Sequence, residues 1–170
     1  MSTIDSRTFR QTLGQFATGV TIIASEIDGT IRAMTANSFT GLSLDPPLVL
    51  FCIGKATKMG QAVQSATGFS VNILRREQQD LSTYFAGGWT HATPPPFSFM
   101  SWEGGPRLEG AASSIGCAVE TVIEGGDHWI VIGRVLALHR LACATPLLFF
   151  DGRYAMLGAS FEAEILVSGF

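Results

Sequence analysis

Residues 20–36 read VTIIASEIDGTIRAMTA, and this stretch decides the fold. An apolar, β-branched run from Val20 to Ser25 is followed by Asp28-Gly29 and then by a second run from Ile31 to Ala36. Glycine takes positive φ angles at little cost, so an Asp-Gly pair between two such runs predicts a tight hairpin. The stretch therefore predicts two antiparallel strands, and not two parallel strands joined by a helix.

The rest of the chain repeats this arrangement of apolar runs and tight turns. Further strands are predicted at residues 48–53, 68–74, 128–138 and 147–150, with an alternating segment around 115–119. Turns are predicted at Glu124-Gly125-Gly126-Asp127 and at Asp151-Gly152. Six or seven strands joined in this way predict a mainly β fold built as an antiparallel barrel, and they argue against a Rossmann fold.

Two or three short helices are predicted around these strands. The first begins at Asp5 or Ser6 and ends at Gly19, and its apolar face carries Phe9, Leu13 and Phe16. Thr57 is placed to cap a second helix that runs to about residue 65, and residues 77–85 have helical spacing. Residues 86–110 are rich in Gly and Pro, which predicts a long loop of the kind that is often functional or mobile.

Length and composition limit the class of protein. A chain of 170 residues suits one domain, residues 1–170, with a single sizeable core. Hydrophobic residues make up 46% and charged residues 15%, which predicts a globular protein with apolar surface buried against a second subunit. The net charge of −3 and the scattered lysines and arginines argue against nucleic acid binding. No apolar stretch reaches membrane-spanning length, and the first residues lack the apolar core of a signal peptide.

Cysteines and histidines show no metal-ligand spacing. Cys52, Cys117 and Cys143 lie far apart, so we expect reduced thiols in a cytoplasmic protein. The three histidines, at positions 91, 128 and 139, also lie far apart in the sequence, and no metal site is expected. The motifs of Rossmann nucleotide binding, P-loops, serine hydrolases and zinc proteases are missing from the sequence.

Two segments are candidates for a ring and a phosphate. Residues 34–38 are small and polar at the end of a strand, so their N–H groups and hydroxyls could meet a planar ring that carries carbonyls and nitrogens. The alternative is an ordinary loop with Asx and Ser turns. Residues 54–59 join a strand end, a glycine and a capped helix start beside Lys55 and Lys58. This combination suits a phosphate, and the alternative is a solvated helix start with two ordinary lysines.

Two further segments contain a histidine and a group of aromatic residues. His128 begins a strand after Gly126-Asp127 and could project into a cleft to hold a nicotinamide or a phosphate. The alternative is a surface histidine on a hairpin. Residues 149–154 place aromatic rings beside a turn, where they could stack on a nicotinamide or adenine while Arg153 meets a phosphate. The alternative is that these rings belong to the core.

The order of these segments resembles the short-chain flavin reductase family, the reductase components of two-component flavin-dependent monooxygenases. The resembling segments are 9–21 (FRQTLGQFATGVT), 34–39 (MTANSF), 43–50 (SLDPPLVL), 69–74 (FSVNIL), 85–87 (FAG), 126–128 (GDH) and 146–150 (PLLFF). No single motif is diagnostic, but the series spans residues 7–158, nearly the whole chain. The resemblance implies a flavin-binding split β-barrel that forms a homodimer, with the flavin near the subunit interface.

The resemblance also assigns residues to the two cofactors. For the flavin, FAD or FMN, it implies Ala33, Met34, Thr35, Ala36, Asn37 and Ser38 along the ring and ribityl chain, Cys52, Ile53 and Gly54 along the ribityl and phosphate, Lys58 and Met59 at the phosphate end, and Tyr84 and Phe85 closing the pocket. For NADH or NADPH it implies His128, Phe149, Phe150, Asp151 and Gly152. Asp151 stands where relatives often carry a basic residue, and an acid would repel a phosphate, which favours NADH over NADPH.

The implied reaction is hydride transfer from C4 of the nicotinamide to N5 of the flavin, and the reduced flavin would then diffuse to a partner monooxygenase. The protein would supply stacking, main-chain donors at residues 35–38, and His128 to position the nicotinamide. One rival is a non-catalytic flavin- or haem-binding split barrel. A second is an oxidase or reductase that acts on a small organic molecule or corrinoid with a tightly held flavin.

Overall fold

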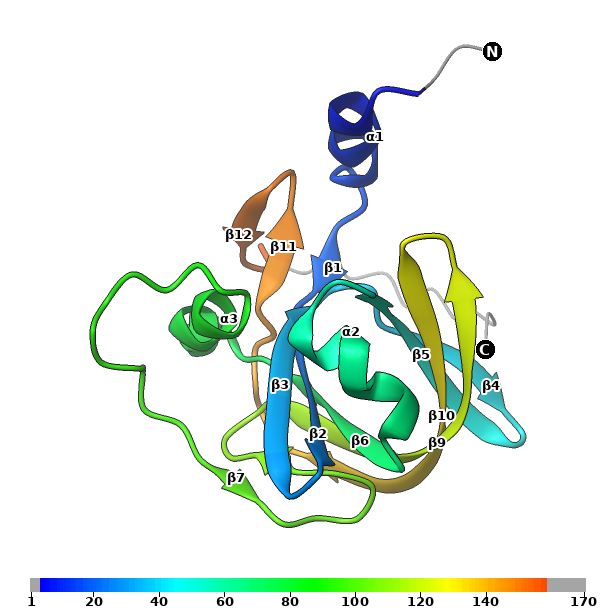
Figure 1. Cartoon of the computed structure of the whole chain (residues 1–170). Helices are drawn as coiled ribbons and strands as arrows, with labels where there is room; N and C mark the ends of the chain where they lie inside the picture. Colours follow the sequence, from blue (N-terminus) through cyan, green and yellow to red (C-terminus); the bar gives the residue numbers. More distant parts are fainter. Residues whose placement is uncertain (1–3, 159–170) are drawn as a thin grey trace.

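Seven antiparallel strands form the main sheet of the protein. The computed structural model describes residues 4–158, and the strand order is β3-β2-β6-β9-β10-β5-β4 (Figure 1). The strands are β2 (Thr21–Ile27), β3 (Thr30–Ala36), β4 (Thr40–Leu44), β5 (Pro47–Gly54), β6 (Gly68–Ile73), β9 (Ser113–Gly125) and β10 (His128–Arg140). The sheet curls until β3 approaches β5, with α2 (Lys58–Ala62) beside both. The predicted antiparallel β-barrel is therefore confirmed.

The two predicted hairpins that organise this sheet form at glycine turns. Asp28 and Gly29 take φ angles of +52° and +70°, and β2 pairs with β3 from Thr21–Ala36 to Ile27–Thr30. Gly126 takes a φ angle of +65° between β9 and β10. Most residues with a side chain are strained at such angles, although Asp tolerates them better than most, so Asp28-Gly29 and Gly126 let the chain reverse within a few residues.

The remaining elements are short. A three-stranded sheet has the order β1-β11-β12, and β7 pairs with β8. Their bounds are β1 (Thr18–Gly19), β11 (Leu148–Phe150), β12 (Arg153–Ala155), β7 (Phe99–Met100) and β8 (Arg107–Leu108). The helices are α1 (Ser6–Leu13) and α3 (Gln79–Phe85), with 3₁₀ turns η1 (Val63–Ser65) and η2 (Arg76–Gln78).

The first two helices are shorter than the sequence predicts, and part of the predicted loop is a strand pair. The first helix ends at Leu13 and not at Gly19, because Thr18 and Gly19 pair with Phe149 and Leu148 of β11 and so belong to a sheet. The predicted helix from 57 to 65 is α2 followed by η1, and the predicted loop 86–110 contains the pair β7–β8. The first difference depends on a partner, β11, that is remote in the sequence.

Apolar side chains fill both sides of the sheet. Ile23, Phe51, Phe69 and Val131 belong to a cluster inside the barrel. A second cluster, which includes Ile22, Leu74, Leu81 and Leu147, lies on the other face beneath α3. Neighbours on a strand point to opposite faces, so the adjacent residues Ile22 and Ile23 serve different cores. The double burial holds β2 and its partner β3 rigidly in place.

Helix α1 stands away from this body. Figure 1 shows it beyond β1, and no residue of α1 is buried. Phe9, Leu13 and Phe16 are exposed, which leaves the apolar face predicted for this helix uncovered. Among the described residues, no helix has the length and apolar character needed to cross a bilayer.

Candidate functional site

Two of the predicted flavin segments lie side by side. Residues 33–36 lie on β3, Asn37 and Ser38 follow its end, and Cys52 to Gly54 end β5. The Ser38 hydroxyl accepts from the main-chain N–H of Cys52 at 3.1 Å and donates to the Cys52 carbonyl at 2.8 Å. Ser38 and Cys52 are 14 residues apart in the sequence, so a single hydroxyl fixes the segment after β3 against the end of β5.

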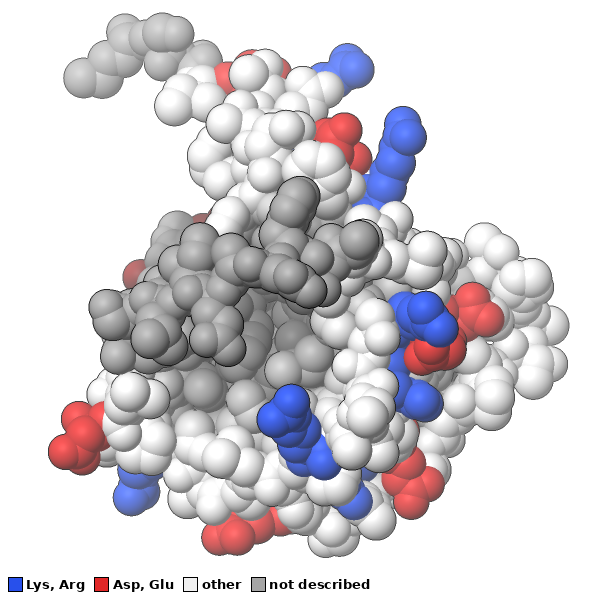
Figure 2. Space-filling view, turned by 180° about the vertical axis from the view of Figure 1, so that it is seen from behind, with Lys and Arg blue, Asp and Glu red and all other residues white. Residues whose placement is uncertain are grey.

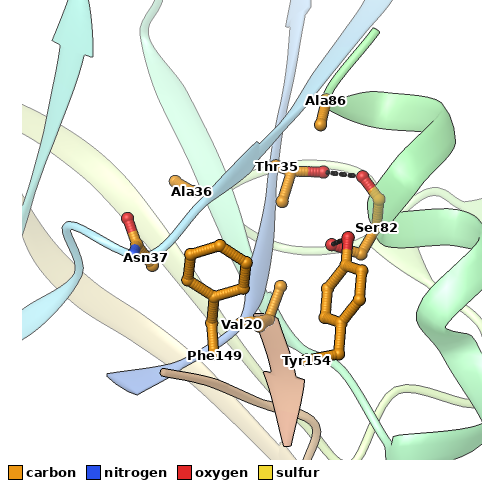
Figure 3. A pocket seen from close by; sticks show the side chains of 8 residues that line it. All are labelled: Val20, Thr35, Ala36, Asn37, Ser82, Ala86, Phe149 and Tyr154. Carbon is orange, nitrogen blue, oxygen red and sulfur yellow. Dashed lines mark hydrogen bonds between the residues drawn. The ribbon is translucent and has the colours of Figure 1, made fainter. Parts of the chain in front are cut away.

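A cavity of about 180 Å³ lies at the end of β3 (Figure 3). Its lining residues are Val20, Thr35, Ala36, Asn37, Ser82, Ala86, Phe149 and Tyr154. Thr35, Ala36 and Asn37 belong to the predicted flavin set, and Phe149 belongs to the predicted nicotinamide set. The fold thus brings members of the two sets to one cavity.

Hydrogen bonds and ring contacts fix one wall of this cavity. Thr35 Oγ1 donates to the carbonyl of Ser82 at 2.6 Å, which joins β3 to α3. The Tyr154 hydroxyl donates to Ser82 Oγ at 2.9 Å. The ring of Tyr154 meets the ring of Phe149 edge to face, with centroids 5.7 Å apart. Because both ends of Tyr154 are held, the aromatic wall is preorganised.

Val20, Ser82 and Ala86 were not predicted, and Tyr154 was predicted only as one of the aromatic rings of residues 149–154, without a place in either cofactor set. Two signals for these residues were present. Ser82 of α3 and Ala86, the C-cap of this helix, are four residues apart, a spacing that places both on one side of the helix. Tyr154 is opposite Phe149 once Asp151-Gly152 is taken as a two-residue hairpin turn.

Tyr84 and Phe85, which were predicted to close the pocket, do not line this cavity. Phe85 packs against the second core cluster and meets Phe97 at a centroid distance of 5.0 Å. Tyr84 lines a different cavity of about 230 Å³, together with Trp89 and His91 of the following loop. The residues of this segment that line the cavity beside Thr35 are Ser82 of α3 and Ala86, the C-cap of the helix.

His128 lies at the other end of the predicted flavin segments. It pairs with Gly54 across β5 and β10, and its Nε2 lies 3.7 Å from the point where a Cβ on Gly54 would stand. Its Nδ1 lies 2.7 Å from Asp127 Oδ1. A carboxylate can only accept, so Nδ1 carries the hydrogen in this contact and Nε2 is left facing Gly54. The hydrogen bond from His128 also lowers the pKa of Asp127 below its ordinary value.

The start of α2 is the second half of the predicted flavin site. Thr57 caps the helix, since its Oγ1 accepts from the N–H of Gly60 at 2.9 Å. Lys58 is exposed beside this start, whereas the side chains of Met59 and Ile53 are buried in the barrel core. Met59 and Ile53 could therefore meet a ligand only through their main chains. First-turn amides have no partner within a helix, which makes them suitable donors for a phosphate.

The turn at Asp151 and Gly152 does not line the cavity. Asp151 and Gly152 take φ angles of +48° and +74°, and the Asp151 N–H donates to the carbonyl of Gly14 at 2.8 Å. Phe150 is partly exposed on β11, and His128 does not line the cavity of Phe149. The predicted nicotinamide residues are thus divided between the cavity, this turn and the β9–β10 tip.

Charged groups do not gather into a metal site or a basic face. The residues from 4 to 158 contain no cluster of three or more His, Cys, Asp or Glu side chains placed to hold a metal. On the face drawn in Figure 2, lysines and arginines are interspersed with acidic residues. The site is therefore built from hydroxyls, an amide, main-chain groups and aromatic rings.

Comparison with known proteins decides the family. The profile of the family described as "Flavin reductase like domain" matches residues 13–158. The chain belongs to this family. The resemblance inferred from the order of the sequence segments is confirmed.

Several flavin reductases share both sequence and fold with the chain. The reductase subunit HsaB of a flavin-dependent monooxygenase from Rhodococcus jostii is 42% identical over 155 residues, which cover 89% of this chain and 77% of the relative. The NADH-dependent FAD reductase of Streptomyces globisporus is 38% identical over 154 residues, with 85% and 82% covered. The solved structure of flavin reductase PheA2 has a TM-score of 0.86 at 40% identity and covers 92% of this chain and 100% of its own.

The residues of the cavity fit the flavin that this family implies. Val20, Ala36 and Phe149 give apolar walls, while Thr35 and Asn37 add a hydroxyl and an amide. Ligand sites commonly combine apolar walls with a few polar groups that fix orientation, and a flavin ring needs both. In this flavin reductase family member, the start of α2 with Lys58 is available for the phosphate end.

Proposed function

We propose that this chain is an NADH-dependent flavin reductase that transfers a hydride from the nicotinamide to FAD or FMN. The observation that carries the proposal is the cavity at which Thr35, Ala36 and Asn37 meet Phe149. Membership of the flavin reductase family and the name of the Streptomyces globisporus relative support it. NADH is favoured over NADPH because the relatives from Streptomyces globisporus and Rhodococcus sp are named NADH-dependent reductases.

The side chains in this proposal bind and orient, and none acts as a nucleophile. When both are bound, C4 of the nicotinamide supplies the hydride and N5 of the flavin receives it. Main-chain N–H groups at residues 35–38 stabilise the negative charge that grows on the flavin ring. Phe149 gives a flat surface for stacking, His128 positions the nicotinamide, and the start of α2 with Lys58 holds the phosphate end.

The reduced flavin is proposed to serve a separate oxygenase. The Rhodococcus jostii relative is named as the reductase subunit of a flavin-dependent monooxygenase, which supports a partner of that class. We propose that the flavin reaches this partner by diffusion, which needs only moderate affinity for flavin.

The chain is proposed to work as a homodimer of one-domain subunits, each spanning residues 1–170, in the cytoplasm. The uncovered apolar face of α1 supports a second subunit, because exposed patches of this kind mark association surfaces. The non-catalytic flavin- or haem-binding alternative is not favoured, since the relatives are named reductases.

An absorbance assay at 340 nm tests the activity. Purified protein is mixed with NADH and excess FAD, FMN or no flavin, and a parallel series contains NADPH. We expect loss of NADH that requires free flavin and is faster than loss of NADPH. Flavin binding without NADH loss would support the non-catalytic alternative, and turnover only with flavin that survives gel filtration would indicate a tightly held prosthetic group.

A further inference from the structure

The tip of the β9–β10 hairpin is attached to the turn between β5 and α2. His128 begins β10 directly opposite Gly54, the last residue of β5. The main-chain N–H of Lys55 donates to the carbonyl of Asp127 at 3.0 Å. These contacts bring the proposed nicotinamide residue against the segment proposed to hold the flavin phosphate.

The side chain of Lys55 adds a second attachment to the same hairpin. Its Nζ forms an ion pair with Glu124 and lies 4.6 Å from the ring centroid of Trp129. Glu124 precedes the turn and Trp129 follows it, so Lys55 contacts both strands of the tip. The Lys55 side chain is only 26% exposed, although its partner Glu124 is 71% exposed.

The two lysines of this segment therefore have different surroundings. Glu124 compensates the charge of Lys55, and Lys55 in turn lowers the pKa of Glu124, so the Glu124 carboxylate stays ionised at neutral pH. Lys58 is exposed one residue after the cap of α2 and forms no ion pair with another described residue. Of these two lysines, Lys58 is therefore the one available to a ligand beside the helix start, whereas Lys55 contacts the β9–β10 hairpin.

We infer that Lys55 is a positioning residue that sets the place of the His128 ring over Gly54 by anchoring the β9–β10 tip. Among the described strands, residues 121–125 of β9 pair only with β10, because β6 pairs with β9 no further than Ala118, so an anchor on both strands restricts movement of this tip. The kinetic part of this inference rests on the proposed reductase function, in which His128 positions the nicotinamide. Lys55 thus acts on the nicotinamide side of the site, although in sequence it lies among the flavin residues.

Lys55→Met and Glu124→Gln test this role through a split between two Michaelis constants. We expect each variant to raise the KM for NADH about threefold to tenfold while kcat and the KM for flavin stay within about twofold. Lys58→Met should show the reverse pattern, with a raised KM for flavin. Lys55→Arg keeps the charge and the cation–π contact and should behave like the unaltered protein.

The matched control removes an ion pair that lies within the β9–β10 hairpin itself. Arg134 pairs with Glu120 at 3.3 Å, within β10 and β9 but outside the tip, so Arg134→Met should leave both Michaelis constants unchanged. Thermal melting of every variant checks the fold. If Lys55→Met fails to fold, Glu124→Gln with the double exchange Lys55→Glu and Glu124→Lys replaces it, and the double exchange should restore the KM for NADH.

A readout without turnover separates this inference from the proposed function. The Cε1–H signal of His128 is assigned by its loss in His128→Ala and is then followed by NMR in the other variants. We expect it to move or broaden in Lys55→Met and Glu124→Gln and to stay fixed in Arg134→Met. An unchanged signal with an unchanged KM for NADH overturns the role of Lys55, as does a rise in the KM for flavin equal to that of Lys58→Met. Absence of NADH oxidation in the unaltered protein counts against the reductase function instead, and the NMR result stands by itself.

Discussion

One ring nitrogen of His128 is hydrogen-bonded to Asp127, and the other is available to a ligand. Asp127 occupies Nδ1, so Nε2 faces the space above Gly54. We predict that His128→Ala raises the KM for NADH severalfold, because a positioning contact made with the bound nicotinamide is lost, and that flavin affinity is unchanged. Steady-state kinetics with varied NADH and a separate flavin titration measure the two effects.

The control for this variant is His139→Ala, which removes an exposed histidine from the other end of β10. It should have the kinetics of the unaltered protein. Equal NADH kinetics in the two variants would contradict a role for His128.

The cysteines differ in reactivity because they differ in burial. Cys117 is completely buried, and burial raises the pKa of its thiol to about 12, whereas Cys143 is exposed. At pH 8 only about one Cys117 thiol in ten thousand is ionised, and the thiolate is the reactive form. We predict that iodoacetamide labels Cys143 first and Cys117 only after unfolding, as peptide mass spectrometry would show. Equal labelling rates in the folded protein would contradict this prediction.

At the scale of elements, the approach of α2 to β5 depends on a glycine. A Cβ on Gly60 would lie 2.1 Å from the Gly54 carbonyl oxygen and 2.9 Å from the capping Thr57 Oγ1. We predict that Gly60→Ala lowers the free energy of unfolding by about 1–3 kcal/mol, because the helix must shift, and that it weakens flavin binding. Thermal melting and a flavin titration measure the two effects.

Gly19→Ala is the matched control for Gly60→Ala, since a Cβ on Gly19 has no neighbour within 4 Å. Its stability should stay within about 0.5 kcal/mol of the unaltered protein. A Gly60→Ala protein as stable as this control would show that α2 can move from Gly54 without penalty.

Six of the seven strands of the main sheet were predictable from the sequence, as was β11 at residues 147–150, whereas β4 and the two-residue strands were not. The predicted strands carry their own apolar runs, and several are bounded by turn glycines, so residues 20–36 alone indicate a hairpin. Thr18 and Gly19 form a strand only because Phe149 and Leu148 lie beside them. Two-residue strands of this kind have no periodicity of their own, which is why the first helix was predicted to be too long.

At the scale of the molecule, the lining of the cavity also depends on contacts between segments that are remote in the sequence. Residues 33–38 and Phe149 were identified from the order of segments in the chain, whereas Ser82 and Ala86 were missed. Their place depends on how α3 packs against β3, an arrangement held by the bond from Thr35 to Ser82. A single sequence contains the spacing within α3 but not the strand on which the helix rests.

The uncovered face of α1 leads to a prediction about assembly. We expect sedimentation velocity to give about twice the 18.2 kDa mass of the chain, because apolar helix faces of this kind are normally covered. Replacing Phe9 and Leu13 together by serine should shift the protein toward the monomer. A monomer at all concentrations of the unaltered protein would contradict the homodimer.

Lys55 reaches the β9–β10 tip twice, once through its main-chain N–H and once through its side chain. Every amino acid except proline retains the main-chain hydrogen bond to Asp127. A saturation library at this codon would therefore vary how firmly the tip is held, without detaching it. Proline alone would cut both links. Substitutions at position 55 should therefore change the KM for NADH in graded steps during laboratory evolution. They would do so without replacing any residue that is proposed to contact either ring.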